Sequence, residues 1–210
     1  MLPEAALVSF AAALFSVMNP LGNVGIFAAL TEDQQPAEAR RTALTCAIAT
    51  AIVLLLMAWV GKPALELFGL SVDMLHAAGG VIVLLIGLHM LSNDNSHRHS
   101  PDEIEDAKQR PSVGIVPLAI PIVAGPGTMA TVLVAAQQHQ TLLSRAEISA
   151  VVIAFSVLTG VMFSFAAPIA KFLGAAGMGV VTRVMGMVLA SIAMGMLASG
   201  LRGLLPGLAG

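Results

Sequence analysis

Charge is scarce in this sequence. Only 10% of its 210 residues are Asp, Glu, Lys or Arg, and 57% are hydrophobic. Soluble domains carry roughly 25% charged residues, and the mean hydropathy here is +0.90. A globule of this size could not bury so much apolar surface, whereas the hydrocarbon core of a bilayer could accommodate it. Composition therefore predicts an all-α membrane protein, with the lipid bilayer as a partner.

Aromatic residues and cysteine are also rare. Aromatics make up 4% of the chain, with no Tyr and one Trp, Trp59. This argues against a cavity for large planar drugs, because such cavities rely on aromatic rings. The single cysteine, Cys46, excludes an intramolecular disulfide. A net charge of −2 leaves no basic surface for nucleic acid.

Several functional motifs are missing as well. The sequence has no GxxxxGK[ST] loop for a nucleotide, no HExxH and no pair of aspartates within an apolar run. We therefore do not expect an enzyme such as an intramembrane protease, and we expect no cofactor and no metal centre. The N-terminus, MLPEAALVSF, lacks the basic segment of a cleaved signal peptide, so we expect it to be retained.

Long apolar runs dominate what is present. Crossing the hydrocarbon takes about 20 mostly apolar residues as a helix, and none of the runs alternates as a barrel strand would. The sequence therefore predicts six transmembrane helices. They cover 5–30, 43–60, 71–92, 113–136, 147–167 and 179–203.

A polar segment, SNDNSHRHSPDEIEDAKQRPS, separates the third and fourth runs and holds eight charged residues. It is typical of a solvated linker. Its histidines, His97 and His99, have no third ligand nearby, so we expect no metal there. The predicted units are a three-helix repeat at 1–92, a cytoplasmic polar linker at 93–112 and a second three-helix repeat at 113–210.

Lys and Arg in short loops set the orientation of a membrane protein, with more of them on the cytoplasmic side. If the N-terminus lies outside, six of these residues fall in the cytoplasm and three outside. We therefore predict both termini in the periplasm of a bacterial inner membrane. The six are Arg40, Arg41, Arg98, Lys108, Arg110 and Lys171, and the three are Lys62, Arg145 and Arg202.

The two halves of the sequence overlay at a shift of about 106 residues. Such internal symmetry is a mark of transporter folds. Because each half holds three spans, an odd number, the halves would enter the membrane from opposite sides as an inverted repeat. The matched residues are Pro63 and Pro168, Gly69 and Gly174, Gly80 and Gly186, Met90-Leu91 and Met196-Leu197, and Pro20 and Pro126.

The first and fourth spans each contain residues that disfavour a helix at matching positions. We predict that both spans are discontinuous there, since broken backbone is tolerated at membrane depth only inside protein or beside a water-filled cavity. Paired breaks indicate a substrate site: the half-helix after each break would attract a carboxylate and the one before it an ammonium or cation. Simple proline kinks are the alternative. The predicted substrate-binding residues are Asn19, Pro20, Gly22, Asn23, Gly125, Pro126, Gly127, Thr128 and Thr131.

Three ionisable residues near the span ends are candidates for ion or proton coupling: Asp73, His76 and Arg183. The first two share a helix face, although an interfacial pair facing water is the commoner arrangement. Arg183 could instead extend to the membrane interface. Ser191, Gly195 and Ser199 form a ridge of small residues for which we expect close helix packing.

Three stretches resemble the MarC family of bacterial inner-membrane proteins. They are FSVMNPLGNVGIFAALT (15–31), GLSVDMLHAAGGVIVLLIGLHML (69–91) and VGIVPLAIPIVAGPGTMATVL (113–133). The resemblance covers nearly the whole chain. It implies six spans, a plasma-membrane address, a relation to LysE-type exporters and transport of small solutes such as alanine or glycine. The hallmark residues carried over are Asn19, Pro20, Gly22, Asn23, Pro117, Pro121, Gly125, Pro126, Gly127 and Thr128.

The leading hypothesis is a secondary transporter of small neutral amino acids that works by alternating access, with the substrate held at the two broken helices. The coupling ion, H⁺ or Na⁺, the direction of transport and assembly into a homo-oligomer are left open. Export of drugs or other small molecules, and a non-transporting subunit of a larger membrane assembly, are the alternatives.

Overall fold

The computed structural model describes residues 2–67, 69–92 and 114–208. The predicted polar linker, with His97 and His99, lies outside the described residues. Apart from short connections, the described ranges are helical. The elements are α1 (Glu4–Met18), α2 (Pro20–Leu30), α3 (Pro36–Leu67), α4 (Val72–Leu91), η1 (Gly114–Val123), α6 (Pro126–Gln138), α7 (Leu142–Ser164), α8 (Ala166–Leu204) and η2 (Pro206–Leu208).

Five helical segments among the described residues are long and apolar enough to cross a membrane. The predicted fourth run, 113–136, is not among them, because its described part is divided into η1, with 10 residues, and α6, with 13. The five are Glu4–Leu30, Pro36–Pro63, Val72–Leu91, Leu142–Ser164 and Ala176–Leu204.

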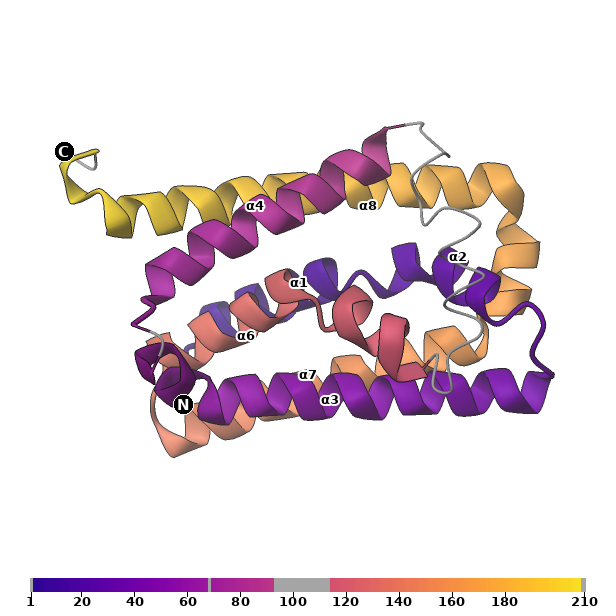
Figure 1. Cartoon of the computed structure of the whole chain (residues 1–210), viewed down its shortest axis with the longest axis horizontal. Coiled ribbons are helices and arrows are strands. Elements are labelled where there is room, and N and C mark those ends of the chain that lie inside the picture. Colours follow the sequence, from indigo (N-terminus) through magenta and orange to yellow (C-terminus); the bar gives the residue numbers. More distant parts are fainter. Residues whose placement is uncertain (1, 68, 93–113, 209–210) are drawn as a thin grey trace.

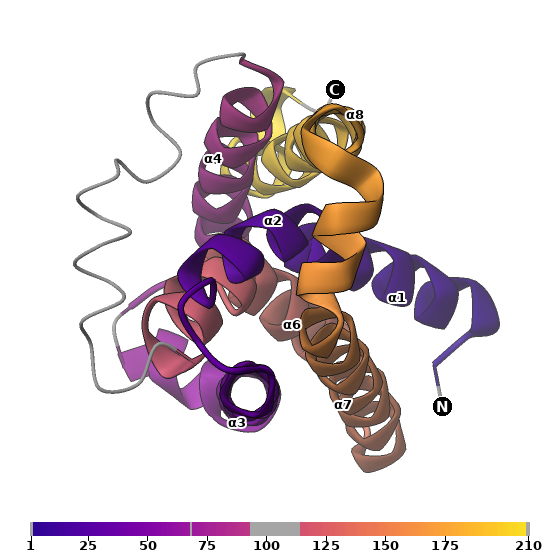
Figure 2. The same cartoon turned by 90° about the vertical axis from the view of Figure 1, so that its right-hand side faces the viewer.

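The helices are stacked in three layers (Figures 1 and 2). One outer layer is formed by α4 and α8 and the other by α3 and α7, and in both layers the two helices pack along each other. The middle layer holds α1 and α2 together with η1 and α6. Interrupted helices therefore lie between two pairs of longer helices, where protein rather than lipid surrounds the free backbone groups.

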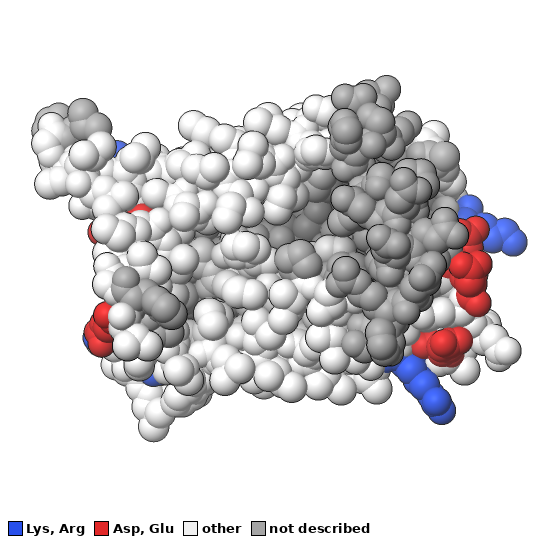
Figure 3. All heavy atoms as spheres, in the orientation of Figure 1, with Lys and Arg blue, Asp and Glu red and all other residues white. Residues whose placement is uncertain are grey.

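On the face shown in Figure 3, the charged side chains of the described residues lie at the two ends, and a belt without them separates the ends. Large aliphatic side chains point outward from this belt: Leu44 is 60% exposed and Val157 is 57% exposed. An apolar outer surface of this extent suits a lipid environment.

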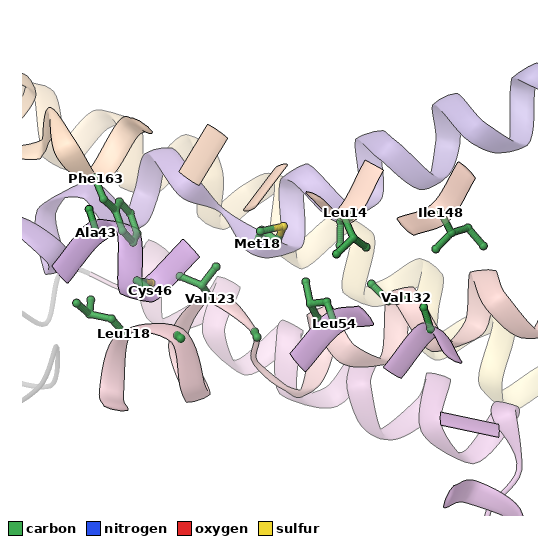
Figure 4. Close-up of a cluster of buried hydrophobic side chains, with 14 of the residues drawn as sticks. Leu14, Met18, Ala43, Cys46, Leu54, Leu118, Val123, Val132, Ile148 and Phe163 are labelled. Atoms are coloured by element: carbon green, nitrogen blue, oxygen red, sulfur yellow. The ribbon is translucent and has the colours of Figure 1, made fainter. Parts of the chain in front are cut away.

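The buried side chains form two clusters. The larger draws on α1, α2, α3, η1, α6 and α7 (Figure 4). The smaller joins α4 and α8 to α6 through Val83, Ala130, Leu189, Ala193 and Met196. The α4–α8 pair therefore packs on α6 of the middle layer through an apolar cluster separate from the larger one.

Glycines bring α4 and α8 into close contact. A Cβ atom added to Gly87 would lie 2.9 Å from the carbonyl oxygen of Gly186, and one added to Gly186 would lie 2.9 Å from the carbonyl oxygen of Gly87. The predicted ridge on α8 was wrong in its position. Ser191, Gly195 and Ser199 are exposed on α8, and a Cβ atom at Gly195 would meet nothing within 4 Å.

Candidate functional site

The first helix break lies at Asn19, between α1 and α2. This residue has φ 48° and ψ 53°, and it is the only non-glycine residue with positive φ in the described part of the chain. Asparagine tolerates this left-handed conformation better than most residues. Its Oδ1 accepts a hydrogen bond from the Gly22 amide at 3.1 Å and so caps α2. Pro20 then occupies the first helical position, where its missing N–H costs little.

Gly22 is required by this cap. A Cβ atom at residue 22 would overlap the Asn19 side chain, with Oδ1 only 2.6 Å away. The sequence Asn-Pro-Leu-Gly therefore builds a turn in which the asparagine supplies the cap, the proline starts the next helix and the glycine leaves room for the carboxamide.

The second break separates η1 from α6. Within η1, Val116 and Ile120 have extended backbone conformations, and each precedes a proline in the sequence. A proline disfavours helical geometry in the residue before it. Gly125 is also extended, with ψ 173°, and Pro126 starts α6. No side chain caps α6, since Gly125 has none to offer.

Matching hydrogen bonds close the carbonyl side of both breaks. The Asn23 side chain donates its Nδ2 hydrogen to the Met18 carbonyl oxygen at 3.0 Å. The Thr128 hydroxyl donates to the Val123 carbonyl oxygen at 2.9 Å. In both cases the donor stands five residues after the acceptor. A polar side chain thus satisfies the last backbone carbonyl before each break.

The two breaks lie close together and are covered. A Cβ atom at Gly127 would lie 3.3 Å from Val17 Cγ1 on α1 and would overlap Val83 on α4. Asn19 and Thr128 are 3% and 1% exposed. Asn19 Nδ2 also contacts the Met90 sulfur of α4 at 3.4 Å. Helix α4 therefore shields the break region.

The other predicted site residues vary in exposure. Pro20, Gly22, Asn23, Gly125 and Gly127 are buried, whereas Pro126 is exposed. Thr131 is half-buried, and its hydroxyl donates to the Gly127 carbonyl oxygen at 2.9 Å within α6. Its hydrogen bond therefore belongs to α6 itself.

A family model described as a MarC family integral membrane protein matches residues 5–205. The chain belongs to the MarC family. The UPF0056 membrane protein YvbG of Bacillus subtilis (strain 168) is 37% identical over 195 residues, covering 92% of both chains. The UPF0056 membrane protein YhcE of Escherichia coli (strain K12) is 30% identical over 196 residues, covering 93% of this chain and 91% of its own. No solved structure matches at a significant level.

Two buried polar residues of this MarC-family chain were not among the site residues predicted from the sequence. The hydroxyl groups of Thr50 on α3 and Ser156 on α7 are buried, and neither makes a hydrogen bond of good geometry, although the Thr50 hydroxyl lies beside the Cys46 thiol one turn earlier. A signal for them was present, because the two residues are 106 positions apart and so match in the overlay of the halves. They attract little attention singly, since serine and threonine are common in apolar helices.

Two of the three coupling candidates, Asp73 and His76, lie at the start of α4, at the opposite end of this helix from Met90, which contacts Asn19. The Asp73 carboxyl group lies against Gly203 of α8. Arg183 is exposed on α8. Within the described ranges, no three His, Cys, Asp or Glu side chains form a group that could hold a metal ion.

An apolar groove of about 400 Å³ runs between α3 and α7. Its lining includes Ala47, Ala51, Ser156 and Gly160, with exposed aliphatic side chains along its sides. None of the break residues lines this groove, so we place the candidate site at the breaks, where Asn19, Asn23 and Thr128 are buried polar residues.

Proposed function

We propose that this MarC-family chain is a secondary transporter that binds a small solute at its two helix breaks. The observation that carries the proposal is the pair of buried interruptions, each closed by a side chain five residues downstream. Discontinuous helices at membrane depth are the usual construction of substrate sites in secondary transporters. Simple proline kinks would not require Asn19 to adopt a left-handed conformation.

We further infer that the chain consists of two inverted halves and that η1 and α6 together complete a sixth crossing. Equivalent elements pack on each other: α3 on α7, and α4 on α8. Their chain directions are opposed (Figure 1). Gly69 and Gly174, matched in the overlay, are the two described glycines with positive φ. An exchange of conformation between such halves would open one site alternately to each side.

The geometry favours a carboxylate as one group of the solute. The amides of the first turn of a helix lack intrahelical partners and attract anions. In α2, the Asn19 side chain already occupies the Gly22 amide. In α6 no side-chain cap is present, so the Gly127 and Thr128 amides remain for a ligand. Because Val83 and Met90 leave little room, we propose a small neutral amino acid.

The α3–α7 groove supports a second candidate function. It is apolar and opens toward the outer surface, so it could take a small amphiphile from the bilayer. Export of such compounds would then depend on the groove rather than on the breaks. Filling the groove with Ala51→Leu should impair this activity.

The proposal is tested by counterflow in proteoliposomes loaded with alanine, glycine, serine or threonine. We expect labelled amino acid to accumulate with at least one of them. We expect Pro126→Ala to reduce the rate while the protein still inserts and purifies normally. Ser191→Ala, at an exposed position on α8, is the matched control. Absence of counterflow for all four would remove the amino acid assignment.

A further inference from the structure

The Thr50 and Ser156 hydroxyls differ from six other helical hydroxyls among the described residues. A serine or threonine within a helix commonly donates to the carbonyl one turn earlier. Neither Thr50, which is 0% exposed, nor Ser156, which is 1% exposed, does so. Those that do are Ser16, Thr131, Ser149, Thr159, Ser164 and Ser191.

Thr50 lies on the face of α3 that meets the helix breaks. Cys46 and Leu54 stand one turn before and after it, and both belong to the buried cluster that contains Met18 and Val123 (Figure 4). Met18 and Val123 are the residues whose carbonyl groups close the two breaks. A hydroxyl at position 50 is therefore directed from α3 toward the middle layer.

Ser156 is at the same level on the neighbouring helix. A Cβ atom at Gly160 of α7 would lie 2.8 Å from Ala47 Cβ of α3. Because the two helices are antiparallel (Figure 1), one turn along α7 brings Ser156 beside Ala51, next to Thr50. The two buried hydroxyls thus lie on adjacent helices at one depth.

A buried hydroxyl without a well-aligned partner is unfavourable, so a ligand group that hydrogen-bonds to these hydroxyls would be stabilised there. An amino acid bound by its carboxylate at α6 needs acceptors for its ammonium group. The Met18 and Val123 carbonyl oxygens already accept hydrogen bonds from Asn23 and Thr128. We propose that the Thr50 and Ser156 hydroxyl oxygens accept hydrogen bonds from the ammonium group of the transported amino acid. This assignment rests on the proposed function, and it adds groups that bind the ammonium to the α6 amides that bind the carboxylate.

The test uses Thr50→Val and Ser156→Ala, which remove the hydroxyls and keep nearly the same shape. Inhibition of labelled alanine counterflow is measured with unlabelled alanine and with propionate, which lacks the amine. We expect each variant to need about tenfold more alanine for half-inhibition, because hydrogen bonds to charged groups are strong. Inhibition by propionate should not change. The ligand-free thermal midpoint in detergent should stay the same or rise, since an unpaired buried group has been removed.

Thr159→Val is the matched control, because Thr159 is buried on α7 and its hydroxyl donates to the Phe155 carbonyl oxygen at 2.8 Å. It should retain the preference for alanine over propionate. Unchanged alanine inhibition in both test variants would overturn the assignment and leave the transporter proposal intact. Equal losses for alanine and propionate, or a fall in thermal midpoint without a change in selectivity, would also overturn it. If the wild type handles none of the four amino acids, both proposals fail together.

Discussion

Asn19 combines two properties that few residue types supply together. It accepts a left-handed backbone, and its side chain caps the helix that follows. Glycine would satisfy the backbone requirement but not the cap. Serine would cap α2 but would be strained at positive φ. The break between α1 and α2 therefore depends on a single side chain.

Replacing Asn19 should separate these two contributions. We expect Asn19→Gly to lower stability modestly, through loss of the cap alone. Asn19→Ala should cost about 1 kcal/mol more, because alanine must also adopt positive φ. Thermal unfolding of the purified protein in detergent would rank the two variants. Equal midpoints for both would mean that the left-handed conformation carries no strain here.

The effects on stability of substituting Gly22 and Asn19 should be coupled. Gly22→Ala places a Cβ atom on the Asn19 carboxamide, so we expect it to displace the cap and cost about 1–2 kcal/mol. In the Asn19→Gly background the same change should cost much less, because the clash is gone. Gly195→Ala is the control, since a Cβ atom there meets nothing within 4 Å. Additive effects of the two changes would contradict this coupling.

At the level of elements, the α4–α8 pair is held by backbone-to-backbone proximity. Gly87 and Gly186 face each other, and Gly200 approaches the Ala77 amide. In a membrane, association of helices relies on such close approach because lipid is as apolar as the side chains. The α4–α8 pair is thus expected to move as one body if the halves exchange conformation.

Widening this contact should loosen the pair. Gly87→Val would press its side chain against the Ala190 amide and the Gly186 carbonyl oxygen of α8. Overpacking of this kind costs about 1–3 kcal/mol, and we expect a lower thermal midpoint with impaired transport. Gly195→Val, on the exposed side of α8, should change neither strongly. A tolerated Gly87→Val would show that α4 and α8 do not depend on this contact.

Across the whole molecule, the positions of helix breaks were predicted better from local residue types than the packing faces of helices were from hydropathy. The predicted run 71–92 closely matches α4 at Val72–Leu91, and helices end at Asn19 and before Pro126, where the local sequence predicted breaks. The ridge of α8 for which close packing was predicted is exposed instead, because hydropathy does not distinguish a lipid-facing small residue from a protein-facing one. The bonds from Asn23 and Thr128 were not predicted either, since they exist only once the chain has turned at each break.

Orientation is a property of the whole molecule and can be tested with single cysteines. Both termini lie at one end, and the turn between α2 and α3 lies at the other (Figure 1). Arg40 and Arg41 follow that turn, and an excess of such charges favours the cytoplasm. In a Cys46→Ala background, we expect a membrane-impermeant maleimide added to intact cells to label Gln140→Cys. It should label Gln35→Cys only after the membrane is permeabilised. The reverse pattern would invert the predicted topology, whereas labelling of both from outside would rule out a full crossing between them.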